Sequence, residues 1–227
     1  MTGEEIPLTG GMSTPGVVRV ADTVRRPPKP DSDYVHALLL HFERMGFAGA
    51  QRFLGIDDRG RAVFSFIEGF APPNNGLRLE ERAVKAGARI VRQVHDLTEG
   101  TEFARGAEVA SHPNLSQPNF VFRELSPVAI IDWDGTGPGT RLDNFADFLW
   151  AFVHPAMYGE GDPAARMLRV ATDAYGWSGG DGLVDAMLEV VRRFQGIVRG
   201  NRGAEEWGAR ELDHLQRNAE LFRAYVG

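Results

Sequence analysis

The sequence predicts an α+β chain with two lobes, a reduced N-terminal sheet lobe and a larger helical C-terminal lobe. Short β-type segments occupy the first third of the chain, whereas nearly everything after residue 143 has the apolar spacing of amphipathic helices. Strands that precede helices, instead of alternating with them, indicate segregated layers. With 227 residues, 43% of them hydrophobic, the chain can bury a sizeable core.

The N-terminal elements are short and separated by glycine and proline. Residues 1–16 are rich in Gly, Thr and Pro and are expected to form a loop. Asp31 or Ser32 is placed to cap the first helix. The expected elements are strands at 17–20 and 23–25, a helix at 33–45, and strands at 51–56 and 62–67. We therefore expect the sheet lobe over residues 1–69 and a connector over 70–78.

The remainder, residues 79–227, is expected to form the helical lobe. It contains one strand pair, whose position matters below because polar residues flank it. The expected elements are a long helix at 79–97, strands at 119–123 and 127–132, and helices at 143–153, 162–175, 181–198 and 204–225. No internal repeat interrupts this order.

Composition narrows the class of protein. A net charge of −6, from 25 basic and 31 acidic residues, argues against a nucleic-acid partner. The absence of cysteine excludes disulfides and thiolate zinc sites, and it suits a reducing cytoplasm. The acidic N-terminus does not resemble a signal peptide, and no apolar run approaches the roughly 18 residues of a membrane span. We expect a cytoplasmic protein without a membrane partner.

The most informative stretch lies between residues 111 and 150, SHPNLSQPNFVF followed by VAIIDWDGTGPGTRLDNFADFLW. His112, Asn114 and Asn119 precede one strand, and Asp132 follows the next. Phosphoryl transfer from a nucleotide needs this arrangement, because its chemistry is mainly positioning and neutralisation of charge. One loop residue orients the acceptor hydroxyl, and an Asn and an Asp hold magnesium across the phosphates.

These residues resemble the aminoglycoside phosphotransferase and choline kinase family, which has a protein-kinase-like fold. Its loop reads H-x-D-L-x-x-x-N and is followed by I-D-W-[DE]. The resemblance implies a metal site at Asn119 and Asp132, with Mg and ATP or GTP as cofactors and a small-molecule substrate. FIEG resembles the segment whose backbone meets adenine, which implies roles for Phe66, Ile67 and Glu68.

The chain departs from this family at the proton acceptor. Asn114 stands where the family carries Asp, and an amide oxygen is too weakly basic to take a hydroxyl proton. Loss of a general base typically slows a reaction by about 10²–10⁴-fold. A loose, metaphosphate-like transition state makes such a loss survivable. Asn114 alone therefore does not decide whether the chain is an enzyme.

A second departure concerns the lysine that contacts phosphates from the small lobe. The chain has two lysines: Lys29 lies between prolines and Lys85 lies on the long helix, so neither fits. The candidates to replace it are Arg19, Arg25 or Arg26, although the planar guanidinium does not place its charge as an ammonium does. Glu43 is the candidate acidic partner on the first helix.

Two further departures concern the supports of the site. Of the turn that covers the phosphates, only GGMSTPG, residues 10–16, remains. Asn144 stands where relatives carry an Asp that braces the loop, with Asp143 adjacent. Three of these residues also have purely structural interpretations. His112 could brace the loop, Asp132 could cap a turn, and Asp134 could be a solvated neighbour instead of a substitute base.

Two hypotheses follow from the matches and departures. The first is a degenerate member of the family whose cleft binds a small molecule or peptide, or performs a reaction other than phosphoryl transfer, in a biosynthetic or modification pathway. The second is an active Mg- and nucleotide-dependent phosphotransferase acting on a hydroxyl group. The joint loss of base, lysine, covering turn and bracing Asp favours the first, and the retained Asn119 and Asp132 favour the second. The substrate, any protein partner and the oligomeric state are not readable from the sequence.

Overall fold

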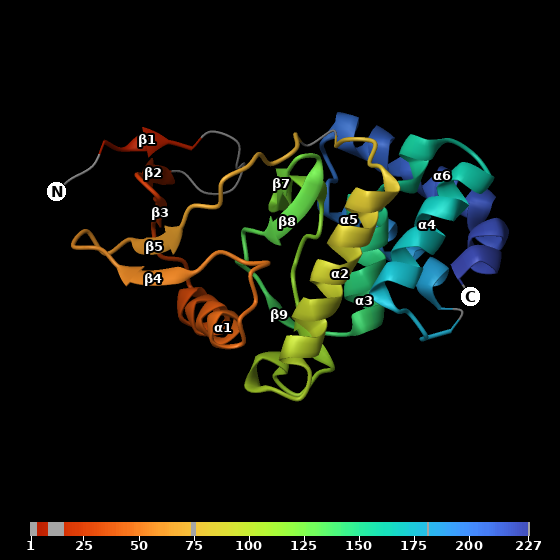
Figure 1. Cartoon of the computed structure of the whole chain (residues 1–227). Coiled ribbons are helices and arrows are strands. Elements are labelled where there is room, and N and C mark those ends of the chain that lie inside the picture. The colour runs from red at the N-terminus through yellow and green to blue at the C-terminus, as the bar shows by residue number, and fades with distance from the viewer. Residues whose placement is uncertain (1–3, 9–15, 74–75, 181, 227) are drawn as a thin grey trace.

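The chain has the two-lobed α+β architecture that the sequence predicts. The computed structural model describes residues 4–8, 16–73, 76–180 and 182–226. In Figure 1 a small sheet and one helix lie at the N-terminal end, and a larger group of helices lies at the other end. Two short two-stranded sheets lie between these parts, and they carry the motif residues.

The small lobe is an antiparallel sheet of five strands in the order β1-β2-β3-β5-β4. The strands are β1 (Ile6–Pro7), β2 (Val18–Val20), β3 (Thr23–Arg26), β4 (Phe53–Ile56) and β5 (Ala62–Ser65). Helix α1 (Ser32–Arg44) packs on the sheet, and its His36 ring stacks on Phe53 at 3.8 Å between centroids. The pairing of β1 with β2 differs from the expected N-terminal loop.

Strand β3 is one residue longer than expected, and this extension matters for the site. Val20 pairs with Thr23 across a tight turn in which Ala21 has a φ of 50°. The pairing of β3 with β5 continues to Arg26, which lies opposite Ala62. Because successive side chains of a strand point to opposite faces, Arg25 and Arg26 are directed to opposite sides of the sheet.

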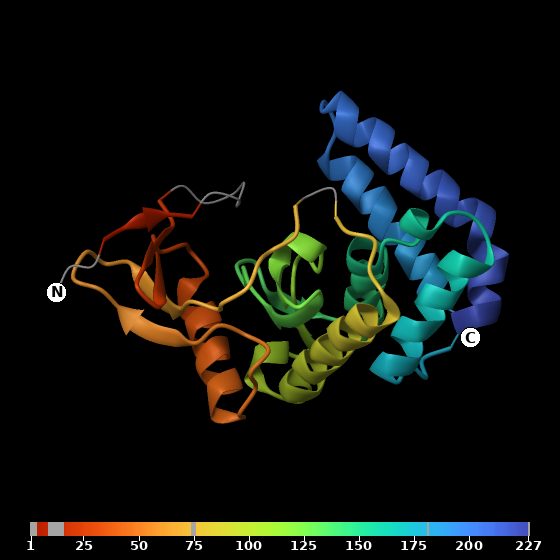
Figure 2. The ribbon, with the colours of Figure 1, turned by 45° about the horizontal axis from the view of Figure 1, so that its top comes forward.

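The large lobe begins with α2, and its other helices surround it. The helices are α2 (Glu81–Thr98), α3 (Arg141–Phe148), α4 (Asp162–Tyr175), α5 (Leu183–Ile197) and α6 (Arg202–Val226), with short helical turns η1 (Glu102–Ala104), η2 (Gln117–Asn119), η3 (Leu149–Val153) and η4 (Pro155–Tyr158). Helix α3 continues into η3, a single π-helical turn. Figure 2 shows α5 and α6 side by side, far from the sheet.

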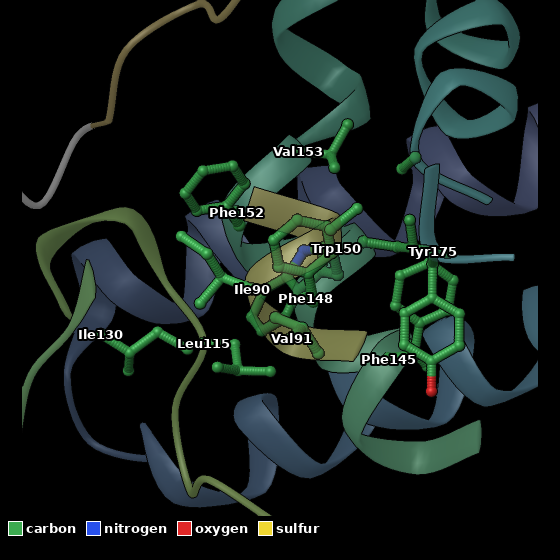
Figure 3. Packing of buried hydrophobic residues seen from close by; sticks show 14 of the residues in the cluster. Ile90, Val91, Leu115, Ile130, Phe145, Phe148, Trp150, Phe152, Val153 and Tyr175 are labelled. Carbon is green, nitrogen blue, oxygen red and sulfur yellow. The ribbon is translucent and has the colours of Figure 1, made fainter. Parts of the chain in front are cut away.

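Aromatic side chains of several helices form the centre of the large lobe. Figure 3 shows Phe145, Phe148 and Phe152 packed together with the α2 residues Ile90 and Val91. All of these are buried, and the rings of Phe148 and Phe152 stack at 4.7 Å. Helix α2 approaches η3 so closely that a Cβ at position 87 would lie 2.8 Å from the Phe152 ring, which explains Gly87.

Two antiparallel strand pairs lie between the small sheet and the helices. They are β6 (Val109–Ser111) with β9 (Gly137–Gly139), and the hairpin of β7 (Phe120–Arg123) with β8 (Ser126–Ile130). Isolated bridges join Ala50 to Ile130 and Phe70 to Phe122, so the β7–β8 hairpin contacts both the small lobe and the connector.

The expected helix cap at Asp31 is replaced by a contact between lobes. Helix α1 begins at Ser32, but the Asp31 carboxylate makes no capping hydrogen bond. Its Oδ2 instead accepts a hydrogen bond from the Gly135 amide at 2.5 Å, while Ser32 Oγ accepts one from the Lys29 amide at 2.7 Å. In the described ranges, no helix combines the length and apolar character that crossing a membrane requires.

Candidate active site

The motif residues His112 to Asn119 form a loop between β6 and β7. The His112 ring is buried, and its Nδ1 accepts a hydrogen bond from the Asn114 amide at 3.2 Å. Its Nε2 lies 3.2 Å from the Ile131 carbonyl, to which the neutral ring donates. Burial lowers the pKa of His112 to about 4, so the ring is uncharged at neutral pH. His112 therefore fixes the loop against the strand that leads to Asp132.

The Asn114 side chain is engaged in the loop itself. Its Oδ1 accepts a hydrogen bond from the Ser116 amide at 3.0 Å, a local turn that precedes η2. The backbone carbonyl of Asn114 accepts a second bond, from Asn119 Nδ2 at 2.9 Å. A carboxylate at position 114 could accept the same hydrogen bond from the Ser116 amide. Unlike a carboxylate, however, the Asn114 amide cannot take up a proton at neutral pH.

The β7–β8 pair brings the backbone of Asn119 next to that of Ile131, the residue before Asp132. Phe120 pairs with Ile130, and the Ile131 amide donates to the Asn119 carbonyl at 2.8 Å. Asp132 follows with a φ of 62°, in the left-handed region, and its side chain is 40% exposed. Because Nδ2 of Asn119 is used within the loop, its oxygen is the atom available to a cation. An amide oxygen beside a partly exposed carboxylate suits Mg²⁺, with phosphate oxygens and water completing the shell.

Two basic side chains of the small lobe reach the aspartates from the other side. Arg26 Nη1 lies 3.2 Å from Asp132 Oδ1, and Arg26 Nη2 bonds Asp134 Oδ1. Lys29 Nζ lies 2.6 Å from Asp134 Oδ2. The side chains of Arg26 and Asp134 are 10% and 11% exposed, so this pair is largely removed from solvent. We call Arg26, Lys29, Asp132 and Asp134 the aspartate clasp.

The clasp changes the interpretation of the basic residues. Arg26 is the arginine that occupies the cleft face of β3, whereas Arg25 bonds Thr23 and lies 3.7 Å from Asp57. Lys29, which does not fit as the phosphate-binding lysine of a small-lobe strand, contacts Asp134. Glu43, the candidate partner of the missing lysine, lies 3.5 Å from Arg52 instead.

The segment expected to meet adenine already makes hydrogen bonds within the protein. The Phe66 amide donates to the Asp22 carbonyl, and the Glu68 carbonyl accepts from Arg123 Nε, each at 2.8 Å. The Arg19 guanidinium lies 3.7 Å over the Phe66 ring and pairs with the Glu68 carboxylate at 3.0 Å. Arg19 thus contacts the Phe66–Glu68 segment that contains Ile67, not the aspartates.

Asn144 braces the loop although it is not an aspartate. Its amide matches the His112 backbone, with Oδ1 accepting from the amide at 3.2 Å and Nδ2 donating to the carbonyl at 2.8 Å. Its Oδ1 also faces His95 Nε2 at 3.0 Å, which must then be the donor. Tyr175 completes the set with its hydroxyl 2.7 Å from His95 Nδ1. We call Asn144, His95, Tyr175 and His112 the loop brace.

A carboxyl group that the sequence reasoning missed lies below the loop. Asp147 Oδ2 accepts a hydrogen bond from the Leu115 amide at 2.7 Å, directly after Asn114. Burial raises the pKa of Asp147 to about 6, and the nearby Arg193 charge opposes this only partly. The signal that could have found it is an acidic residue in the otherwise apolar run 145–153, three residues after Asn144.

Other candidate sites would be groups of metal-binding side chains or cavities in the described part of the chain. Among the described residues, no three His, Asp or Glu side chains form a group that could hold a metal ion, so any cation here needs ligands from a bound molecule. Cavities of about 720 and 380 Å³ lie in the helical lobe. The first is lined by Leu79 and Tyr158, the second by Arg141 and Trp177.

Comparison with known proteins identifies the fold. No family model matches the sequence. Aminoglycoside phosphotransferase APH(3'')-Id from Streptomyces rimosus, solved with ADP and streptomycin, is 14% identical, with a TM-score of 0.57 and coverage of 95% of this chain and 93% of that one. A choline/ethanolamine kinase family protein from Mesorhizobium loti is 16% identical, with a TM-score of 0.51 and coverage of 99% and 92%. The chain therefore has the protein-kinase-like fold of these phosphotransferases.

A curated sequence relative narrows the family. The trifolitoxin immunity protein of Rhizobium leguminosarum bv. trifolii is 32% identical, and the match covers 77% of this chain and 75% of that protein. The chain belongs to the family of this immunity protein.

Proposed function

We propose that this chain is an immunity protein that holds a toxic small molecule or peptide in a kinase-like cleft, without transferring phosphate to it. The family relationship supports the protective role, since the relative is an immunity protein against trifolitoxin. The observation that carries the absence of phosphoryl transfer is the aspartate clasp. Arg26 and Lys29 already neutralise the carboxylates that a nucleotide-bound metal would occupy.

Two other contacts support a binding role. The Asn114 amide lacks a proton acceptor and is bonded to the Ser116 amide. Two backbone groups of the Phe66–Glu68 segment, which would have to meet adenine, are bonded to Asp22 and Arg123. Nucleotide binding at this edge would need those bonds to break. The cleft is therefore better suited to a ligand other than a nucleoside triphosphate.

The structure changes how much each departure from the phosphotransferase motifs counts as a lost function. Asn144 braces His112 through two hydrogen bonds, and Arg26 supplies a cation from β3, so neither position counts as a loss. The covering turn falls almost wholly on residues 9–15, outside the described ranges. The proposal rests on Asn114 and the clasp, not on an accumulation of four changes.

The protective role is tested by expression of the chain in a trifolitoxin-sensitive strain. We expect survival with the unaltered chain, and equal survival with Asn119→Ala, because binding without transfer does not use a metal ligand. Loss of protection in the Asn119→Ala strain, at equal protein level, would contradict a transfer-independent mechanism. No protection by either chain would refute immunity to this particular toxin.

The absence of transfer is tested with the purified protein. We expect no melting-temperature shift with ATP or GTP that depends on Mg²⁺, and no nucleoside diphosphate released when gentamicin or streptomycin is added as acceptor. Metal-dependent turnover on any hydroxyl acceptor would refute the proposal.

An active phosphotransferase is the second candidate, because Asn119 and Asp132 flank the β7–β8 pair and carry donor atoms that fit magnesium. Asn119 Oδ1 and Asp132 would hold the ion, which would neutralise charge on the transferred phosphoryl group. Arg26 would contact phosphate only after leaving Asp132. If the missing base alone limits the rate, Asn114→Asp raises transfer or nucleotide hydrolysis by about 10²-fold or more. Background rates in that variant would eliminate this candidate.

A further inference from the structure

We propose that Lys29 is a built-in replacement for a divalent cation at the aspartate pair, so that the two lobes close over the ligand without metal. This inference rests on the proposed binding function and specifies how its cleft is regulated. Lys29 Nζ lies 2.6 Å from Asp134 Oδ2, and Arg26 occupies the other oxygen of the same carboxylate. Asp134 therefore has a cation on each oxygen.

The net charge of the clasp supports this role. Asp132 and Asp134 together carry a charge of −2, which a Mg²⁺ ion would neutralise. Arg26 and Lys29 supply +2 from the small lobe, so the clasp is neutral without any ion. Asp134, whose side chain is 11% exposed, requires such compensation more than Asp132, whose side chain is 40% exposed. The opposite charges come from different lobes, so neutralisation also holds the lobes together.

The backbone around Lys29 is arranged to hold it in this position. Pro27, Pro28 and Pro30 flank it, and proline restricts φ and lowers the conformational freedom of the segment. The Lys29 amide donates to Ser32 Oγ at 2.7 Å, and its carbonyl accepts from the Ser32 amide at 3.1 Å. The ammonium is therefore presented by a constrained backbone instead of a mobile loop.

A third contact closes the same junction. The Asp31 carboxylate accepts the Gly135 amide, one residue beyond Asp134. Segment 26–31 of the small lobe thus contacts segment 132–135 of the large lobe through two cations, which share Asp134, and one anion, which accepts from the Gly135 amide. A divalent ion that entered at Asp134 would have to displace Lys29, and its charge would be repelled by Arg26.

The chain offers a direct observation of this site, because its only two lysines are Lys29 and Lys85. Reductive ¹³C-methylation keeps their charge and gives one NMR signal from each, apart from the amino terminus. Lys85 is 44% exposed on α2 and pairs with Glu81, so it is the internal control. We expect Mn²⁺ at millimolar concentration to leave the Lys29 signal as sharp as that of Lys85. Selective broadening of Lys29 at micromolar Mn²⁺ would overturn the proposal.

A variant series checks the same point on unmethylated protein. Lys29→Met removes the charge, and we expect Mn²⁺ to bind this variant about tenfold or more tighter than the unaltered chain, because a repelling charge is gone. Lys29→Arg keeps the charge and Lys85→Met changes a distant one, so both should match the unaltered chain. Equal Mn²⁺ affinity in Lys29→Met and Lys85→Met would refute the inference.

These measurements use neither nucleotide nor toxin. If the clasp binds no Mn²⁺ but the protein transfers phosphate, the proposed function is refuted and the inference about Lys29 stands. Mn²⁺ bound tightly at the aspartates of a protein that protects without transfer would refute this inference alone.

Discussion

The two halves of the cleft are built by different physical means. On the large-lobe side, the loop brace holds the motif loop through hydrogen bonds among uncharged, buried groups: Asn144, His95, Tyr175 and His112. On the small-lobe side, the aspartate clasp holds segment 26–31 through ion pairs with partly exposed partners.

This difference indicates which half of the cleft has a fixed geometry and which half responds to salt and to competing ions. In a buried neutral network, leaving one group without its partner costs more free energy than a single hydrogen bond contributes. Such a network therefore has a single stable arrangement. Ion pairs with exposed members are screened by salt and compete with other ions. The loop geometry is thus a property of the fold, whereas closure of the small lobe depends on charge.

The largest effect is expected from breaking the loop brace at its centre. Asn144→Leu removes two hydrogen bonds to His112 and leaves His95 Nε2 without an acceptor, so we expect a loss of about 4 kcal/mol in the free energy of unfolding. Urea unfolding measures this. Asn144→Asp, which keeps the acceptor and loses the donor, should cost clearly less. Equal costs would mean that the retained side-chain acceptor contributes nothing.

The second prediction is that acid destabilises the folded protein through the loop brace. Burial lowers the pKa of both His95 and His112 to about 4, while the unfolded chain has the ordinary value of 6.5. Between these values the unfolded state binds more protons, so stability is present above pH 6.5 and is lost as pH falls towards 4. We expect each histidine to contribute about 3 kcal/mol to this loss, and protonation of Asp147 over the same window to offset part of it. A flat profile from pH 7 to 4.5, measured by unfolding at constant salt, would contradict the neutral network.

Breaking the clasp should cost less. Arg26→Gln removes both ion pairs and leaves Asp134 with Lys29 alone, and we expect a loss of about 2 kcal/mol that shrinks in high salt. The control is Arg52→Gln, since Arg52 is 60% exposed and its pair with Glu43 should contribute less than about 0.5 kcal/mol. If the two variants lose equal stability, the clasp is no stronger than a surface pair.

The last effect is a gain of stability, at Asp147 below the loop. Its raised pKa means that the folded state holds a proton more tightly than the unfolded state, so ionisation reduces stability as pH rises from about 4 to 6. Asp147→Asn keeps an acceptor for the Leu115 amide and removes that penalty. We expect a gain of up to about 3 kcal/mol at pH 7.5 and almost none at pH 4. A gain that is independent of pH would show that burial of the charge is not its cause.

The sequence by itself determined the fold class and the core of the site. The helix at 162–175 was predicted with its observed ends, and Asn119 and Asp132 were predicted to lie together. The helix prediction succeeds because periodic apolar residues define a helix locally, whereas a metal site shared by Asn119 and Asp132 stays a prediction. Departures at single positions were also readable, because they are departures from a spacing.

Only the tertiary structure decided what the basic residues do. Arg26 and Asp134 are separated by 108 positions, and nothing near either residue indicates the other. Lys29 was set aside as a phosphate-binding lysine, and only the structure shows its ammonium beside Asp134. Asn144 looked like a lost aspartate until its amide was seen against both polar groups of His112. Such pairings depend on how two lobes are placed against each other, and that placement is a property of the whole packed chain rather than of any segment.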